Sequence, residues 1–195
     1  PIQHIDGDGE IALCILSAIN VGKLRNLDEM EELCDLSVRA LDELIDYQGY
    51  PVEAARVSTL ARRSIGVGFI GLAHYLAKNG VKYDDKEAWK LVHDLSEVFQ
   101  YNLLKASNKL AMEKGQCEYF NRTKYYDGVL PIDTYKKDVD ELVPNDLSCD
   151  WGTLRENILT YGLRHSTLSA QMPSESSSVV SNATNGIEPP RAFLS

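Results

Sequence analysis

The chain has 195 residues, of which 44% are apolar and 25% are charged, and its formal net charge at pH 7 is -9. This length and apolar fraction suffice for one sizeable core and argue against a disordered chain. The negative charge offers no general attraction to nucleic acid, so we expect no DNA or RNA partner. No stretch has the length of a membrane-spanning helix and no signal peptide is recognisable, so we expect no membrane partner either.

The four cysteines, Cys14, Cys34, Cys117 and Cys149, are scattered along the chain. No two form a Cys-x-x-Cys pair and none has a ligand-type neighbour at zinc spacing, so we expect no metal site. Scattered free thiols are typical of a reducing compartment, which predicts a cytoplasmic protein. The chain begins with Pro1 and ends directly after an apolar run, from which we expect a piece of a longer protein.

The first predicted elements are a strand and a helix. The apolar run from Glu10 to Ile19 follows the turn-rich Asp-Gly-Asp-Gly and predicts a buried strand. Asp28 is a good N-cap for a helix from Glu29 to about Gln48. The apolar stripe of this helix is predicted to contain Leu33, Leu36, Leu41, Leu44 and Ile45, with Cys34 and Val38 beside it in the core.

Four more elements follow. The glycine-rich run from Gly66 to Gly71 is expected to open a helix, and a long amphipathic helix begins after Asp84 or Asp85 and stops at Gly115. Residues 116–150 are predicted to form loops with short helical turns. A helix from Trp151 to about Tyr161 ends at Gly162, and Leu163 to Met172 is predicted to be a strand. This order predicts an α/β protein, a single partial domain over residues 1–195 with only part of a sheet visible.

The segment Gly66 to Gly71 matches the pattern Gly-x-Gly-x-x-Gly, which in a dinucleotide site opens a helix after a buried strand. Arg62 and Arg63 stand where that strand should end, and no acidic residue follows at the expected distance after a second strand. The alternative is that these glycines allow a helix to pack closely against its neighbours. We favour close packing over dinucleotide binding.

The histidines are not spaced as ligands or as acid–base partners. His74 and His93 lie in predicted helices, on the surface or at the edge of the core. His165 lies on the predicted strand that leads into a serine-rich stretch, so it is closer to a candidate site, although it is equally compatible with a packed, hydrogen-bonded residue. Cys14 lies within the first predicted strand. It is either a buried structural thiol or a redox thiol facing a cavity, and nothing local decides between the two.

The stretch Pro173, Ser174, Glu175, Ser176, Ser177 and Ser178 comes directly after the last predicted strand, and a helix could start at Val179. A strand, a serine-rich turn and a helix N-terminus together make an anion site, because free amides and hydroxyls point at the ligand. The Glu175 carboxylate would repel a phosphate and should turn away from it. The alternative is a capping cluster followed by an ordinary loop.

Several longer segments resemble the large subunit of class I ribonucleotide reductases. Trp151 to Leu154, Gly162 to His165, Ser169-Ala170 and Pro173 follow the order of that family's signature, and the serine stretch with Ser181 to Arg191 resembles its substrate loop. Gly9 to Asn20, Arg62 to Lys78 and Leu130 to Asp138 are also similar to this family. The resemblance extends over essentially the whole chain.

The resemblance implies part of a ten-stranded α/β barrel, its C-terminal half-barrel. It implies a ribonucleoside diphosphate substrate, whose 3′-hydrogen a thiyl radical removes before the 2′-hydroxyl leaves as water. Two barrel cysteines supply the electrons by closing a disulfide, and Cys14 matches one of them. Pro173 to Ser177, with Ser178 adjacent, match the loop that holds the substrate diphosphate.

The remaining parts of such an enzyme are expected outside this chain. They are the radical cysteine with its acid–base partners, the second redox cysteine, the sites for the allosteric effectors ATP and deoxynucleotides, and a radical-generating small subunit with a diiron–tyrosyl centre. Thioredoxin or glutaredoxin would reduce the disulfide. We therefore expect this piece to be inactive alone and to hold no cofactor of its own. The alternatives are a structural assembly module of a split enzyme and a dinucleotide-dependent oxidoreductase using Gly66 to Gly71.

Overall fold

The computed structural model describes residues 9–144 and 146–190. Its sheet has two parallel strands, β1 (Ile15–Asn20) and β2 (Ile65–Ile70), with Ile15 opposite Ile65 and Asn20 opposite Ile70. The first strand is therefore shorter than predicted. Before it, the backbone N–H of Ile11 donates to the carbonyl of Ala54 instead of joining the ladder. The strand is also only partly buried, because the described residues place no strand on its outer edge.

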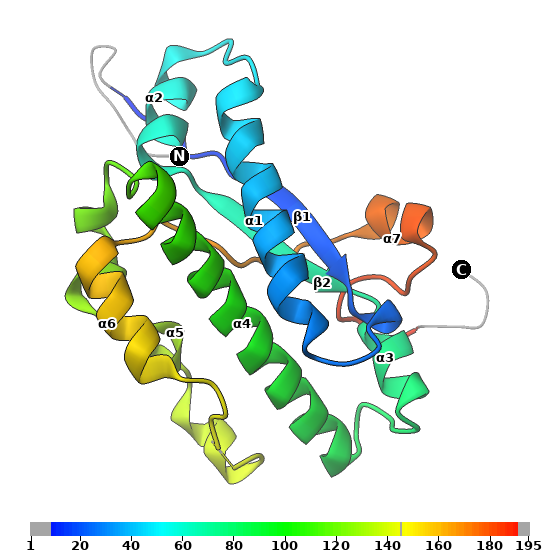
Figure 1. The fold of residues 1–195 in the computed structure, drawn as a ribbon. Helices are drawn as coiled ribbons and strands as arrows, with labels where there is room; N and C mark the ends of the chain where they lie inside the picture. Colours follow the sequence, from blue (N-terminus) through cyan, green and yellow to red (C-terminus); the bar gives the residue numbers. More distant parts are fainter. Residues whose placement is uncertain (1–8, 145, 191–195) are drawn as a thin grey trace.

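The helices of the described residues are α1 (Glu29–Tyr47), α2 (Glu53–Arg62), α3 (Leu72–Lys78), α4 (Lys86–Lys114), α5 (Pro131–Thr134), α6 (Trp151–Tyr161) and α7 (Glu175–Ser181). Most of them lie on one side of this sheet, whereas α7 lies on the other side of the strands from α4 and α6 (Figure 1). Short 3-10 turns cover Val21–Lys23, Phe120–Arg122, Lys124–Asp127 and Lys137–Glu141. The predicted helices at α1, α4 and α6 and the short turns of residues 116–150 are confirmed.

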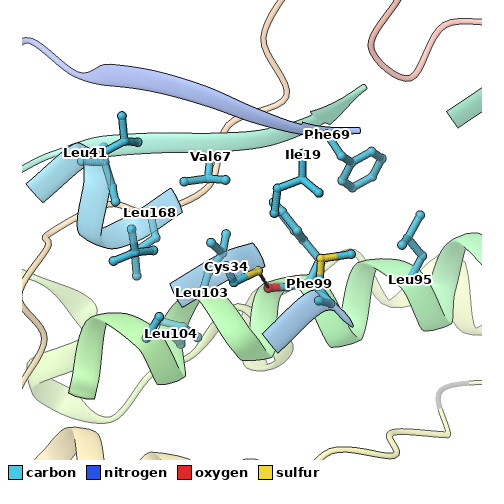
Figure 2. Packing of buried hydrophobic residues seen from close by; sticks show 14 of the residues in the cluster. Ile19, Cys34, Leu41, Val67, Phe69, Leu95, Phe99, Leu103, Leu104 and Leu168 are labelled. Atoms are coloured by element: carbon cyan, nitrogen blue, oxygen red, sulfur yellow. Dashed lines mark hydrogen bonds between the residues drawn. The ribbon is translucent and has the colours of Figure 1, made fainter. Parts of the chain in front are cut away.

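The core lies between the sheet and the α1–α4 pair. α4 lies between α1 and α6 (Figure 1), and its apolar face meets β2, where the rings of Phe69 and Phe99 contact edge to face with centroids 5.3 Å apart. Cys34 of α1 is fully buried here, as predicted, and its thiol contacts the carbonyl of Phe99 (Figure 2). Burial raises the pKa of this thiol to about 12, which keeps it protonated.

The predicted apolar stripe of α1 is correct only in part. Leu41 and Ile45 are buried together with Cys34 and Val38, but Leu36 is 56% exposed and Leu44 is 45% exposed. Asp28 precedes the helix without a side-chain capping hydrogen bond. The helix is therefore rotated about its axis relative to the prediction, with a second apolar stripe left on its surface.

The prediction of a helix at Gly66 to Gly71 is wrong. Residues Ile65–Ile70 form the fully buried strand β2, and the helix begins only at Leu72, after Gly71 with φ of 82°. A Cβ atom on Gly66 would lie 2.6 Å from the Leu16 Cδ2, and one on Gly68 would lie 2.3 Å from the Ala170 carbonyl oxygen. The glycines allow close packing, as favoured, but they do so within a strand.

The strand predicted for Leu163 to Met172 is reduced to one bridge, in which Ser169 pairs in parallel with Val67. The N–H groups of Ile65 and Val67 donate to the carbonyls of Thr167 and Leu168, at 3.2 and 2.8 Å. The donors, on Ile65 and Val67, are two residues apart, whereas the acceptors, on Thr167 and Leu168, are only one residue apart. The two segments therefore do not keep a constant register, and no regular ladder forms. The segment still passes directly beside β2 and leads into the serine-rich stretch.

Candidate functional site

The serine-rich stretch forms the beginning of a helix and not the loop before one. α7 starts at Glu175, four residues earlier than the predicted start at Val179, with Ser174 at the N-cap position. The first intrahelical hydrogen bond runs from the N–H of Ser178 to the carbonyl of Ser174, 2.8 Å. Since the first turn has no intrahelical acceptors, the N–H groups of Glu175, Ser176 and Ser177 are free for a ligand.

The six predicted binding residues divide by burial. Ser174 and Ser178 are buried, whereas Pro173, Glu175, Ser176 and Ser177 are exposed. Ser174 is engaged within the protein: its Oγ donates to the Met172 carbonyl, 2.9 Å, and its N–H donates to Asn185 Oδ1, 3.3 Å. The Ser178 Oγ, in contrast, is buried without a hydrogen-bond partner. The exposed donors are therefore those of Ser176 and Ser177, with an unsatisfied hydroxyl one residue further on.

The end of α7 is tied to the carboxyl ends of the two strands. The Asn20 Nδ2, at the end of β1, donates to the carbonyl of Ser181 at 3.4 Å, and the N–H of Gly71 donates to that of Thr184 at 2.9 Å. Asn182 closes the helix in the left-handed region, with φ of 49°. These contacts fix the position of α7 beyond the strand ends, where it lies in Figure 1.

Sequence reasoning missed Asn185 and Asn20 as supports of this site. Asn185 accepts the hydrogen bond from the N–H of Ser174, eleven residues before it. The run Asn-Ala-Thr-Asn-Gly from Asn182 to Gly186 carried the signal, because Asn and Gly are typical of turns in which side chains satisfy backbone groups. The partner across eleven residues could not be identified from this local pattern.

Cys14 directly precedes β1 and is exposed, so the interpretation as a buried thiol within a strand is wrong. Leu16, two residues later, packs over Gly66 from the same side of the sheet as Ala170. A Cβ atom added at Gly66 would lie 2.6 Å from the Leu16 Cδ2 and 2.9 Å from the Ala170 Cβ. The face of the sheet that carries Leu16 is thus the one along which the chain passes toward α7. Among the described contacts, none joins Cys14 to residues 173–178.

The other three thiols are free but poorly suited to redox chemistry. Cys117 is buried, and burial raises the pKa of its thiol to about 11. Burial also raises the pKa of the half-buried Cys149. Because the thiolate is the reactive form, neither these thiols nor Cys34 is activated. Cys14 is the exposed one among the four, all of which lie in the described part of the chain.

His165 is a packed residue and not an acid–base group. It is fully buried, its Nδ1 lies 2.9 Å from the Ser107 Oγ, and its Nε2 lies 3.2 Å from the Asp42 Oδ1. Burial lowers the pKa of His165, which keeps the ring neutral. Asp42 also accepts from Arg63 at 2.6 Å and Arg164 at 3.2 Å. This cluster fastens the chain before the serine stretch to α1 and α4.

The carboxylate of Asp42 stays ionised although it is fully buried. Burial alone would raise its pKa, but His165 and Arg63 outweigh burial and hold the pKa well below its usual range. His74, on α3, is exposed and His93, on α4, is half-buried, which confirms both predictions. Within residues 9–144 and 146–190, no group of three or more His, Cys, Asp or Glu side chains could hold a metal ion.

The glycines of Gly66 to Gly71 do not form a nucleotide-binding turn. Gly66 and Gly68 lie inside β2, where they stand opposite Leu16 and Ala18 of β1. A dinucleotide site needs such glycines in the turn between a strand and a helix. Of the helices that the structure describes, none is long and apolar enough to cross a membrane.

Comparisons with known proteins agree on one family. The family model described as the barrel domain of ribonucleotide reductase matches residues 2–195. The chain is 63% identical over its whole length to the ribonucleoside-diphosphate reductase subunit alpha of Haemophilus influenzae, covering 26% of that protein. It is 59% identical over 77% of its length to the ribonucleoside-diphosphate reductase 1 subunit alpha of Escherichia coli. It is 50% identical over 96% of its length to the ribonucleoside-diphosphate reductase subunit alpha of phage T4. The chain spans about a quarter of the length of the relatives it matches.

Proposed function

The chain belongs to the barrel-domain family of ribonucleotide reductases, and on this premise we propose that it forms part of the catalytic barrel of a ribonucleoside-diphosphate reductase large subunit. The reaction would convert a ribonucleoside diphosphate and a dithiol into the deoxyribonucleoside diphosphate, a disulfide and water. Its product class serves DNA synthesis. The residues of this chain would contribute substrate binding and one of the two electron-donating thiols.

The substrate diphosphate would bind at the first turn of α7. The observation that carries this assignment is the set of unused donors there: the exposed hydroxyls of Ser176 and Ser177 and the free amides of residues 175–177. Amides and hydroxyls at a helix start stabilise negative charge without a counter-ion. The exposed Glu175 side chain has room to point away from the phosphates.

Cys14 would be one thiol of the redox pair. Its exposure and its position immediately before β1 support this role, since a disulfide must form with a cysteine on another element and be reduced again by an external protein. The second thiol, the radical cysteine and the effector sites would lie in parts of the large subunit beyond these residues. A radical-generating small subunit and thioredoxin or glutaredoxin would be the partners, in the cytoplasm.

An assembly module without a part in substrate binding is the second candidate. It is favoured by the outer edge of β1, which has no partner strand among the described residues, because an unpaired strand edge promotes association with another chain. In that case the chain would complete a barrel, but the serines of α7 would not contact substrate. The dinucleotide-dependent oxidoreductase is not supported, since Gly66 and Gly68 lie within a strand.

A chimera tests the proposal. The matching segment of the Haemophilus influenzae relative, 63% identical, is replaced by this chain, and the product is assayed with that organism's small subunit. We expect formation of deoxyribonucleoside diphosphate, and its loss when Ser176 and Ser177 are both replaced by Ala. A chimera that folds and is active but is indifferent to these substitutions would favour the assembly module. A chimera that folds like its parent and is inactive would overturn the proposal.

A further inference from the structure

A second polar pocket lies at the amino end of β2, the end opposite to α7. It has a volume of about 390 Å³ and is formed where the end of α2, residues 122–134 and residues 166–167 meet. The N–H of Ser166 donates to the carbonyl of Arg62 at 2.9 Å, and the N–H of Ile65 donates to that of Thr167 at 3.2 Å, which joins two of these segments at the strand. A strand of six residues is about 20 Å long, so this amino-end pocket is separate from the first turn of α7.

The amino-end pocket is basic although the chain is acidic. Arg62, Arg122 and Lys124 contribute to its lining, and none of the described residues that line it is Asp or Glu. The whole chain, in contrast, has 29 acidic and 20 basic residues. Outside the lining, the Glu10 carboxylate pairs with Arg62 at 2.9 Å and approaches Arg122 only to 4.0 Å, so it neutralises one of the three cations. The remaining positive charge attracts anions into the pocket.

The donors of this pocket are positioned but not used. The Arg122 guanidinium lies over the ring of Tyr119, 3.7 Å from its centroid, and forms no hydrogen bond with another described residue. Lys124 is exposed and forms no ion pair within the part of the chain that the structure describes. The exposed hydroxyls of Thr134 and Thr167 line the same space. A guanidinium with free N–H groups beside an ammonium group and hydroxyls is a donor set that suits the oxygens of a phosphate.

One wall of the amino-end pocket is apolar. It is formed by Tyr125, Val129, Leu130 and Pro131. Inorganic phosphate would leave this wall without a contact, whereas a phosphate ester could lay its organic part against it. The volume of the pocket also lies within the range of small-molecule sites, about 300–1,000 Å³.

We propose that the amino-end pocket binds a small organic phosphate, with the phosphate group between Arg122 and Lys124 and the apolar part against Tyr125. The site shares no residue with the serine-rich stretch of α7. The proposal therefore stands or fails independently of the function proposed for that stretch.

Lysine footprinting in the Haemophilus influenzae chimera tests this site. The chimera is treated with an amine-acetylating reagent at increasing concentrations of phenyl phosphate, of inorganic phosphate, or of KCl at matched ionic strength. Mass spectrometry then measures the acetylation of Lys124 and, as the control, of Lys105, which is 45% exposed and pairs with Glu31 away from the pocket. Because the readout is specific to one residue, phosphate bound elsewhere in the enzyme does not affect it.

We expect phenyl phosphate at ten times its dissociation constant to reduce the acetylation of Lys124 roughly tenfold and to leave Lys105 unchanged. Half-maximal protection should need less phenyl phosphate than inorganic phosphate. Arg122→Gln should raise the concentration needed about tenfold or more, since a charge-assisted hydrogen bond is lost. The control Arg25→Gln, at an exposed arginine that pairs with Glu29, should not change it. Unchanged acetylation of Lys124 without ligand shows that each variant keeps its fold.

Three results would overturn the proposal. Equal protection of Lys124 by KCl would reduce the effect to screening of charge. A Lys124 that is unreactive without ligand would show that the pocket is closed in the large subunit. Equal protection by inorganic and phenyl phosphate would assign the pocket to the free anion and reject the organic ligand.

Discussion

The N–H of Ser174 donates to the Asn185 Oδ1 across 3.3 Å, which joins the residue before α7 to the turn after it. This bond closes residues 174–185 into a compact unit whose far end is held by Gly71 through the carbonyl of Thr184. These hydrogen bonds hold the first turn of α7 in a fixed position, as precise binding of a diphosphate requires. We call residues 174–185 the frame of the site.

Replacing Asn185 by Ala should raise the KM for ribonucleoside diphosphate in the chimeric enzyme. The lost hydrogen bond contributes about 1 kcal/mol, which corresponds to roughly fivefold if the whole effect falls on binding. Steady-state kinetics with the variant measures this change. Asn121→Ala, at an exposed position outside the unit, is the control, and an equal KM in both variants would argue against the role of the frame.

The double variant Ser176→Ala, Ser177→Ala should bind substrate much more weakly. Each hydrogen bond to a charged phosphate contributes about 1.5–3 kcal/mol, so the loss of two should raise KM by roughly a hundredfold or more. Substitution of Ser169, which is exposed but lies before the site, should leave KM unchanged. Substrate titration at a constant concentration of small subunit distinguishes these outcomes, and an unchanged KM in the double variant would reject the assignment.

Cys14→Ser should prevent multiple turnover and leave binding of the diphosphate near normal. A hydroxyl cannot form the disulfide that supplies the two electrons, whereas the phosphate-binding donors are untouched. Product formed per enzyme, measured with thioredoxin and its reductase present, reports this directly. Cys149→Ser serves as the control because burial already raises the pKa of that thiol. Normal turnover of Cys14→Ser would remove it from the redox role.

Gly68→Val should strongly destabilise the chain. A Cβ atom at Gly68 would lie 2.3 Å from the Ala170 carbonyl oxygen, so the segment leading to α7 must shift, and overpacking of this kind costs about 1–3 kcal/mol or more. Urea unfolding measures the loss. The control is Gly49→Ala, where no atom lies within 4 Å of the new Cβ. Equal free energies of unfolding for the two variants would contradict the packing described for β2.

Stability should fall in acid because of His165. Burial lowers the folded-state pKa of His165 from 6.5, so below that pH the unfolded chain binds more protons and the free energy of unfolding decreases as the pH falls. Asp42, whose pKa is lowered from 3.8, acts in the same direction at lower pH. His165→Asn should flatten the decrease between about pH 7 and 5, whereas His74→Asn should not. Urea titrations at several pH values separate the two variants.

The sequence predicted the helices well because their signals are local. α4 and α6 have clear apolar periodicity and stop at Gly115 and Gly162, both with positive φ. β2 was misassigned because its six residues are all buried and two are glycines, which are poor strand formers. The reason for those glycines is the approach of Leu16 and Ala170 from distant parts of the chain, which no local pattern contains.

The candidate site was predictable in composition but not in geometry. The serines were identified from their order and from the resemblance, and Ser176 and Ser177 do lie exposed in a first helical turn. The start of α7 at Glu175, the internal use of Ser174 and the exposure of Cys14 could not be predicted. The first two depend on contacts formed in the folded chain, such as the one between Ser174 and Asn185. The exposure of Cys14 depends on the outer edge of β1, which lacks a neighbour in the described sheet.

The most direct test of the central claim is equilibrium binding of a ribonucleoside diphosphate and of the corresponding nucleoside to the chimeric large subunit, with and without Ser176→Ala, Ser177→Ala. The account predicts that the chimera prefers the diphosphate and that the double variant loses this preference while its affinity for the nucleoside is unchanged. A double variant that retains the full preference for the diphosphate would contradict the claim that the first turn of α7 holds the substrate.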